Sequence, residues 1–219
     1  MKSLNMRENQ TKGFLITFCG LDGCGKTTMI NKLNEELSQK YSVFLTKQPT
    51  AAVRQSEIFR TYMDSPDHSK YDYRSLSLLA ASDRIQHSTK TIEPLLSKGN
   101  FVLSDRYYYS CLANLRARGF KKDRWIYEIA ESILKPDLAF FFDVPVETAV
   151  ARVRSRPEEK DRYIDMTFQQ KLRNEYLNIC KKNGGILIST EQPVEDCYQI
   201  MKEAVERMVD THESNRTSH

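Results

Sequence analysis

The residues that could carry chemistry begin with one glycine-rich loop. Residues 20–27 read Gly-Leu-Asp-Gly-Cys-Gly-Lys-Thr and fit the pattern G-x-x-x-x-G-K-[ST], which binds nucleotide phosphates. Glycines let backbone N–H groups turn inward around the phosphates, because no Cβ stands in the way. A helix that begins near Lys26 points its positive end at the same anion. The loop therefore predicts a site for a nucleoside triphosphate.

Each residue of the loop has an expected role. Lys26 is expected to reach the β- and γ-phosphates, and the Thr27 hydroxyl is expected to complete the coordination of Mg²⁺. The next residue, Thr28, is expected to support the start of the helix. A tight turn that binds nothing is the alternative. We predict these nucleotide-binding residues in the loop: Gly20, Asp22, Gly23, Cys24, Gly25, Lys26, Thr27 and Thr28.

The loop does not name a reaction by itself. A GTPase would need an N-K-x-D motif to read guanine, and the chain has none. Motor and transporter ATPases usually need a longer chain. The remaining interpretations are a small phosphotransferase and a nucleotide-binding relative that has lost turnover.

Alternating apolar and amphipathic segments indicate how the loop is positioned. Short, almost continuously apolar runs predict buried strands of a parallel sheet covered on both faces, at 14–19, 42–46, 101–104, 138–143 and 185–189. Amphipathic patterns between them predict helices, at 26–40, 53–63, 72–98, 107–134 with a break near Gly119, 145–155, 166–183 and 194–209. This alternation predicts the α/β class, with a five-stranded parallel sheet flanked by helices.

The chain is expected to form one domain, 13–210, between frayed tails at 1–12 and 211–219. Two polar segments leave the sheet, at 49–74 and 152–165. The second segment holds four arginines, Arg152, Arg154, Arg156 and Arg162. Beside a phosphate-binding loop it predicts a lid over the phosphates; a solvated helix face is the alternative.

The composition excludes several classes of protein. Of 219 residues, 40% are hydrophobic and 28% are charged, which is ordinary for a globular protein and excludes a collagen-like or fully disordered chain. The net charge of +4, from 33 basic and 29 acidic residues, favours anionic ligands but is too weak to indicate a nucleic-acid partner.

Membrane and secretory signals are absent from the pattern. No run approaches the roughly 18 apolar residues of a membrane span, and the polar start of the chain does not read as a secretory signal. The five cysteines are odd in number and show no CxxC spacing, so neither a disulfide framework nor a zinc site is expected. We predict a cytoplasmic protein with no membrane partner.

Six segments and the arginine-rich lid together resemble the thymidylate kinases of the P-loop nucleoside-monophosphate kinase superfamily, over nearly the whole chain. The segments are ITFCGLDGCGKTT (16–28), TKQP (46–49), LLAASDRIQH (78–87), LSDRYYYS (103–110), PDLAFFFDV (136–144) and TEQPVED (190–196). The resemblance implies a flexible lid, ATP and Mg²⁺, and transfer of the γ-phosphoryl group to thymidylate (dTMP), giving dTDP and ADP. It also implies nucleotide substrates and a possible homodimer.

The resemblance also implies roles for single residues. Asp105 would hold Mg²⁺, and Arg106 would grip the acceptor phosphate; capping of the following helix is the alternative for this pair. Arg84 and Arg60 would bind the acceptor phosphate as well. Asp22 would lie near the 3′-hydroxyl of the acceptor sugar.

Two further implied roles concern ATP. The turn at Gln192 and Pro193 would border the adenine. Some family members place an arginine in the phosphate loop; this loop has none, so the lid would supply the arginine for the transition state. Arg156 and Arg152 are the candidates, beside Lys26, Asp105 and Arg106 as catalytic residues.

The departures from the family concern the base of the acceptor. Ala80 stands where the family has an aromatic ring that stacks on thymine, and Leu115 where a glutamine bonds to the base. The family's R-E-P-G-G reads Lys-Gln-Pro-Thr-Ala at 47–51. Loss of an aromatic ring that stacks on the base costs about 1–3 kcal/mol of binding free energy. The acceptor is therefore open between dTMP, another nucleotide and a small phosphorylated metabolite.

Overall fold

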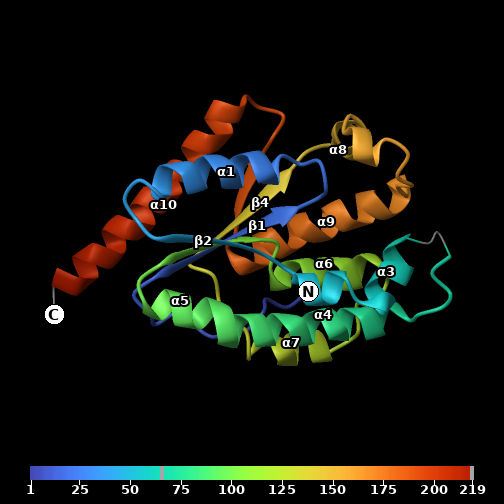
Figure 1. Cartoon of the computed structure of the whole chain (residues 1–219), viewed down its shortest axis with the longest axis horizontal. Coiled ribbons are helices and arrows are strands. Elements are labelled where there is room, and N and C mark those ends of the chain that lie inside the picture. The colour runs from blue at the N-terminus through green and yellow to red at the C-terminus, as the bar shows by residue number, and fades with distance from the viewer. Residues whose placement is uncertain (65–66, 218–219) are drawn as a thin grey trace.

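The computed structural model describes residues 1–64 and 67–217. Five strands form one all-parallel sheet in the order β2-β3-β1-β4-β5 (Figure 1). They are β1 (Phe14–Gly20), β2 (Val43–Lys47), β3 (Phe101–Asp105), β4 (Leu138–Asp143) and β5 (Ile186–Ser189). The predicted α/β class and the five strand positions are confirmed.

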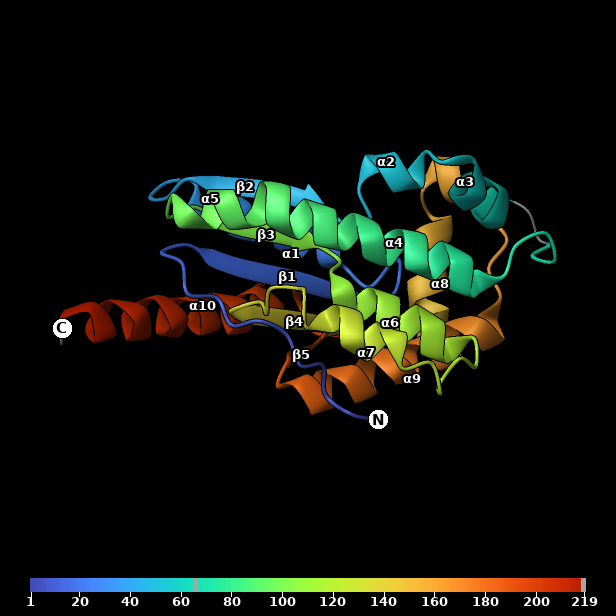
Figure 2. The ribbon, with the colours of Figure 1, turned by 90° about the horizontal axis from the view of Figure 1, so that it is seen from below.

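Helices cover both faces of the sheet, which explains the nearly continuous apolar strands. One face carries α1 (Lys26–Leu37) and α10 (Val194–Thr217). The other carries α4 (Tyr73–His87), α5 (Glu93–Ser97) and α6 (Tyr108–Ala117) (Figures 1 and 2). The helices α7 (Trp125–Ala130) and α9 (Met166–Asn183) pack on α6.

The central strand β1 is buried in the core, whereas the edge strand β2 is partly exposed. All seven residues of β1 are buried. In β2, Phe44 and Leu45 are 37% and 44% exposed, although the sequence predicted a buried strand there. The reason is position in the sheet, because β2 has a neighbour on one side only.

Two predicted helices are divided in the structure, and a third shows the break that the sequence predicted. The segment 53–63 forms α2 (Ala51–Arg54) and α3 (Glu57–Asp64). Between α4 and α5 the helical path continues through one π-helical turn, η1 (Ser88–Ile92). The segment 107–134 breaks between α6, which ends at Ala117, and α7; Gly119, with a φ of +94°, lies in the break as predicted.

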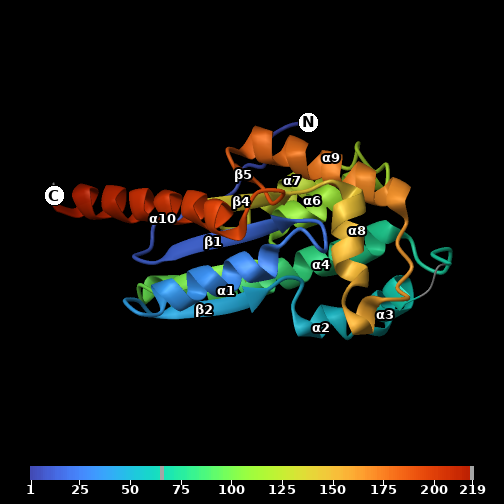
Figure 3. The same cartoon turned by 90° about the horizontal axis from the view of Figure 1, so that it is seen from above.

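Residues near both ends of the chain contact the rest of the domain. The helix predicted to end at residue 209 continues to Thr217 and projects beyond the sheet (Figure 3). Its His212 ring packs edge-on against Phe14, with centroids 4.9 Å apart. At the other end Met6 is buried, and the Arg7 N–H donates to the Ile133 carbonyl at 2.9 Å. Residues 218–219 lie outside the described part.

The carboxyl ends of the strands gather the polar segments that the sequence singled out. The phosphate loop follows β1, α2 and α3 follow β2, and α8 (Val146–Arg154) follows β4 (Figure 3). Part of the predicted polar segment 49–74 falls on residues 65–66, outside the described residues. None of the helices within 1–64 and 67–217 combines the length and apolar character that crossing a membrane requires.

Candidate active site

The phosphate loop joins β1 to α1 through three glycines in left-handed or related backbone conformations. Gly20, Gly23 and Gly25 have φ values of 142°, 81° and 86°, which residues with a Cβ rarely adopt. Two of them also lie against other backbone. A Cβ at Gly20 would lie 2.5 Å from the Phe142 carbonyl oxygen, and a Cβ at Gly23 would overlap the Ala149 carbonyl oxygen. The loop is therefore fixed in shape by its contacts with β4 and α8.

Lys26 is held over the loop by the loop's own carbonyls. Its Nζ donates to the Leu21 oxygen at 2.7 Å and to the Gly20 oxygen at 3.1 Å, and the Cys24 sulfur lies at 3.5 Å. The side chain is only 7% exposed. A buried ammonium on backbone carbonyls is poised for an anion, since phosphate oxygens are stronger, charge-assisted partners.

Arg106 lies directly after β3 in a conformation that is rare for its type. Its φ is +66°, and strained backbone of this kind clusters at functional sites. The N–H donates to the Phe18 carbonyl at 2.9 Å, and Ser104 Oγ donates to the Arg106 carbonyl at 2.7 Å. The guanidinium donates through Nη1 to the Tyr176 hydroxyl at 3.0 Å and through Nη2 to Asp22 at 2.5 Å. Hydrogen bonds thus hold both the backbone and the guanidinium group of Arg106 in place.

Asp22 joins the loop, the end of β3 and the lid. One carboxylate oxygen accepts from Arg106, and the other lies 3.3 Å from Nη2 of Arg162. The charge of Arg106 holds the pKa of Asp22 well below its ordinary value, and Lys26 and Arg162 act in the same direction. Asp22 is therefore ionised at any physiological pH, and it neutralises part of a strongly basic site.

These groups line one cleft of about 250 Å³. It is bounded by the phosphate loop, the ends of β2 and β3, and the lid. Its lining residues are Asp22, Gly23, Gly25, Lys26, Thr27, Thr28, Lys47, Asp105, Arg106, Arg156, Glu159 and Arg162. Most of the residues that the sequence assigned to phosphate chemistry therefore meet at one place.

The cleft offers two oxygens to a divalent cation. Asp105 Oδ1 is buried and has no hydrogen-bond partner among the described residues; Oδ2 pairs with Nζ of Lys47 at 3.1 Å. Thr27 lines the same cleft. No cluster of three or more acidic, His or Cys ligands occurs within 1–64 and 67–217. This donor set fits a cation that takes its other ligands from water and substrate phosphates, as Mg²⁺ does in kinases.

The lid separates its arginines between two places. Arg152 donates from Nη2 to the Thr190 carbonyl at 2.9 Å and from Nη1 to its hydroxyl at 3.2 Å, so it lies beside β5 and outside the lining of the phosphate cleft. Arg156 and Arg162 line that cleft. Glu159 lies between them, 2.8 Å from Arg162 and 3.9 Å from Arg156. Of the two predicted catalytic arginines, Arg156 therefore lies at the phosphate cleft and Arg152 outside its lining.

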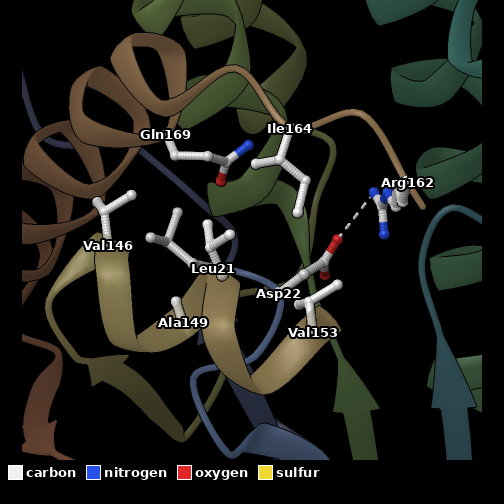
Figure 4. A pocket seen from close by; sticks show the side chains of 9 residues that line it. Leu21, Asp22, Val146, Ala149, Val153, Arg162, Ile164 and Gln169 are labelled. Atoms are coloured by element: carbon white, nitrogen blue, oxygen red, sulfur yellow. Dashed lines mark hydrogen bonds and ion pairs between the residues drawn. The ribbon is translucent and has the colours of Figure 1, made fainter. Parts of the chain in front are cut away.

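A small apolar junction joins the lid to the phosphate loop (Figure 4). Leu21 of the loop packs among residues of α8 and of the start of α9. Figure 4 shows the Asp22–Arg162 pair at the edge of this junction, with Val153 and Ile164 nearby. Apolar contact and one ion pair thus hold the lid against the loop.

The other residues predicted to bind ATP lie in or near the phosphate cleft. Thr28 lines the cleft. Gln192 and Pro193 are exposed and precede α10, where the Pro193 carbonyl accepts from the N–H of Cys197 at 3.1 Å. Their turn follows Thr190, which Arg152 binds. Arg152 and this turn therefore border one surface.

The acceptor-side residues do not converge in the same way. Arg84 is 3% exposed, and its Nη1 donates to the Ala80 carbonyl at 2.9 Å. Arg60 lies on α3 and is exposed. Ala80 and Leu115, at 8% and 0% exposed, both pack in the hydrophobic core. The structure thus brings Arg84 near the core and leaves Arg60 at the surface.

Three residues of the site escaped the sequence reasoning. Lys47 could have been found, because it replaces a family arginine at the end of the second strand. Glu159 and Tyr176 carry no such signal; only the lid's path and the packing of α9 bring them to Arg162 and Arg106.

Comparison with known proteins gives one consistent result. Residues 18–200 match the family model described as thymidylate kinase. A probable thymidylate kinase of Pyrococcus horikoshii is 37% identical over 175 residues, which cover 78% of this chain and 84% of the relative. The thymidylate kinase of Onion yellows phytoplasma is 32% identical over 88% of this chain and 97% of its own. That of Geobacillus sp. (strain WCH70) is 33% identical, covering 89% and 96%.

Proposed function

The chain belongs to the thymidylate kinase family, and we propose that it transfers the γ-phosphoryl group of ATP to the phosphate of dTMP, giving dTDP and ADP. The observation that carries the proposal is the single cleft in which Lys26, Arg106 and two lid arginines face a glycine loop. Such a concentration of fixed positive groups suits a polyphosphate and a second phosphate together.

The protein's part in this transfer is alignment and charge neutralisation. Lys26 exchanges the Leu21 and Gly20 carbonyls for phosphate oxygens of ATP. Arg106 binds the acceptor phosphate through its fixed fork, which can contact two oxygens at once. Asp22 keeps that fork in place, and ionisation of Asp22 does not vary across neutral pH.

The family uses a divalent metal, and we take it to be Mg²⁺. When bound, such an ion would supply neutralisation of the charge that develops during the transfer. Thr27 and Asp105 are the side chains that would hold it. Lys47 pairs with Asp105 in this structure. With the ion bound, Lys47 would share the Asp105 carboxylate with it or turn toward a phosphate.

The lid completes the site. Arg156 is proposed as the arginine that stabilises the transferred phosphoryl group, and Arg152 as a residue on the adenine side, beside Gln192 and Pro193. Closure of the lid excludes water, which otherwise competes as the acceptor.

A coupled ADP-release assay tests the proposal. Purified protein with ATP and Mg²⁺ is given dTMP, dUMP, dCMP, other monophosphates or no acceptor. We expect dTMP-dependent ADP release, lost by at least about 100-fold in Lys26→Ala and retained in the matched control Lys122→Ala, an exposed lysine. Turnover with a different acceptor alone would contradict the dTMP assignment. Unchanged turnover in Lys26→Ala would contradict the catalytic role of the cleft.

The cellular compartment and the oligomeric state of the protein are also proposals. All five cysteines are buried free thiols, which fits a reducing cytoplasm. A homodimer is supported by apolar side chains on neighbouring helices, since Leu78 of α4 and Met63 of α3 are 44% and 48% exposed. Light scattering on the purified protein measures the oligomeric state directly; a monomeric mass at assay concentration would contradict the dimer.

A further inference from the structure

Three charged residues of the lid, three positions apart, lie on one side of a tight turn. Pro157–Glu159 form η2, a 3-10 turn, in which the side chains of residues i and i+3 lie above one another. The N–H of Glu159 donates to the Arg156 carbonyl at 3.0 Å, and the N–H of Arg162 donates to the Glu159 carbonyl at 3.2 Å. Arg156, Glu159 and Arg162 therefore reach the phosphate cleft together.

The carboxylate of Glu159 pairs with both of these arginines. Its Oε2 lies 2.8 Å from Nη1 of Arg162, and its Oε1 lies 3.9 Å from Nη1 of Arg156. Arg162 has a second carboxylate, that of Asp22, at 3.3 Å (Figure 4). In the described part of the chain, Glu159 supplies the carboxylate within 4.0 Å of Arg156. Removal of this charge would therefore release Arg156 and leave Arg162 paired with Asp22.

The charged side chains that line the cleft carry a small positive excess. They are five basic groups, of Lys26, Lys47, Arg106, Arg156 and Arg162, and three carboxylates, of Asp22, Asp105 and Glu159. ATP, partly neutralised by its divalent ion, offsets this excess. The phosphate of an acceptor then adds about two negative charges. From that point a carboxylate in the cleft is unfavourable, because like charges repel.

Of the three carboxylates, that of Glu159 can leave the cleft most easily. Asp22 belongs to the phosphate loop, whose shape is fixed by its contacts with β4 and α8, and Asp105 ends β3. Glu159 lies on the lid and has the longer side chain. Its oxygens compete with phosphate oxygens for the same guanidinium groups. An added phosphate would therefore displace Glu159 first.

We propose that Glu159 is a positioning residue, which keeps Arg156 engaged until the acceptor phosphate enters the cleft. The inference rests on the proposed function and adds a control on its timing. The reaction that Glu159 limits is hydrolysis of ATP. A water oxygen bonds to the γ-phosphorus, and the bond from that phosphorus to the bridging oxygen of ADP breaks. One proton of the water passes to solvent and the other stays on inorganic phosphate.

The test compares hydrolysis with transfer in the full chain. Glu159→Gln keeps the size of the side chain and removes its charge. Without an acceptor, its release of inorganic phosphate from ATP and Mg²⁺ should rise by at least about threefold, as expected for loss of an exposed ion pair. The ratio of inorganic phosphate to dTDP formed with dTMP present should rise with it.

A neighbouring residue gives the matched control. Glu158 belongs to the same turn and is exposed, but it does not line the cleft. Glu158→Gln makes the same change of charge and should leave hydrolysis and the ratio as they are in the unsubstituted protein.

A binding measurement gives a readout that needs no turnover. A non-hydrolysable analogue of ATP, titrated without a divalent ion or an acceptor, should bind Glu159→Gln about 2- to 5-fold more tightly than the unsubstituted protein. This gain should shrink at about 0.5 M salt, because interactions between exposed charges are screened.

Three results would overturn the inference. They are unchanged hydrolysis in Glu159→Gln, an equal rise in Glu158→Gln, and slower transfer in Glu159→Gln without faster hydrolysis. In the last case Glu159 would be needed for the transfer itself. Absence of dTMP-dependent turnover in the unsubstituted protein would instead contradict the proposed function, since the comparison of hydrolysis needs no acceptor.

Discussion

The phosphate cleft and the buried face of α4 differ in how their polar groups are satisfied. In the phosphate cleft, Lys26 is bonded to backbone carbonyls of its loop, and Arg106 to Asp22 and Tyr176. On α4, Arg84 is 3% exposed, its Nη1 donates to the Ala80 carbonyl, and its Nε has no partner among the described residues. A phosphate site can be built from groups that also stabilise the free protein, because backbone and carboxylate oxygens resemble phosphate oxygens.

The largest expected effect lies in the lid. Arg156→Ala should lower kcat by about 10³-fold with little change in the KM for ATP, since a lid arginine acts mainly on the transition state. Arg152→Ala should instead leave kcat nearly unchanged and raise the KM for ATP by about 10-fold. The reason is that Arg152 binds Thr190 beside the proposed adenine turn. Steady-state kinetics with varied ATP separates the two. If Arg152→Ala lost kcat and Arg156→Ala did not, the assignment of the lid arginines would be reversed.

The tight packing of the phosphate loop predicts the next effect. Gly23→Ala should lower stability by about 2–4 kcal/mol and reduce activity, because its Cβ would overlap the Ala149 carbonyl oxygen of α8. Gly99→Ala is the matched control. Gly99 has a similar φ of 85°, and a Cβ added there would meet no atom within 4 Å, so only the conformational cost of about 1 kcal/mol remains. Urea unfolding of both variants measures the difference; equal losses would show that the contact with α8 is unimportant.

The smallest effect concerns the ion pairs of Asp22. Arg106 lowers the pKa of Asp22 below its ordinary value of 3.8, so the charged carboxylate stabilises the folded state above that pH. The contribution is lost as the pH falls through the lowered pKa. Asp22→Asn should therefore cost about 1 kcal/mol or less near pH 7, since the side chain is 45% exposed.

Unfolding measured from pH 7 down to pH 3 should show this difference shrinking below about pH 4. Asp161→Asn, at an exposed lid residue, serves as the control and should show no such trend. A difference between Asp22→Asn and the unsubstituted protein that grew on acidification would mean that Asp22 is not held ionised by Arg106.

Local patterns predicted the fold well. The strands follow from apolar runs, and the helix at 166–183 was predicted with its observed bounds. The predictions failed where the surroundings of an element decide. The exposure of Phe44 and Leu45 depends on β2 lying at the edge of the sheet. The extension of α10 to Thr217 is accompanied by the contact of His212 with Phe14, far away in the sequence.

The sequence by itself determined the phosphate loop, because Gly20 through Thr27 act through their own backbone and through the helix that follows directly. It also determined that an arginine-rich segment, 152–165, follows β4. Only the tertiary structure decided which of the arginines at 152–165 line the phosphate cleft, that Asp22 joins Arg106 and Arg162, and that Arg84 is buried with its Nε unpaired among the described residues. These outcomes depend on side chains separated by 84 and 140 residues in the Asp22 pairs, and pairing over such distances is set by packing, not by local pattern.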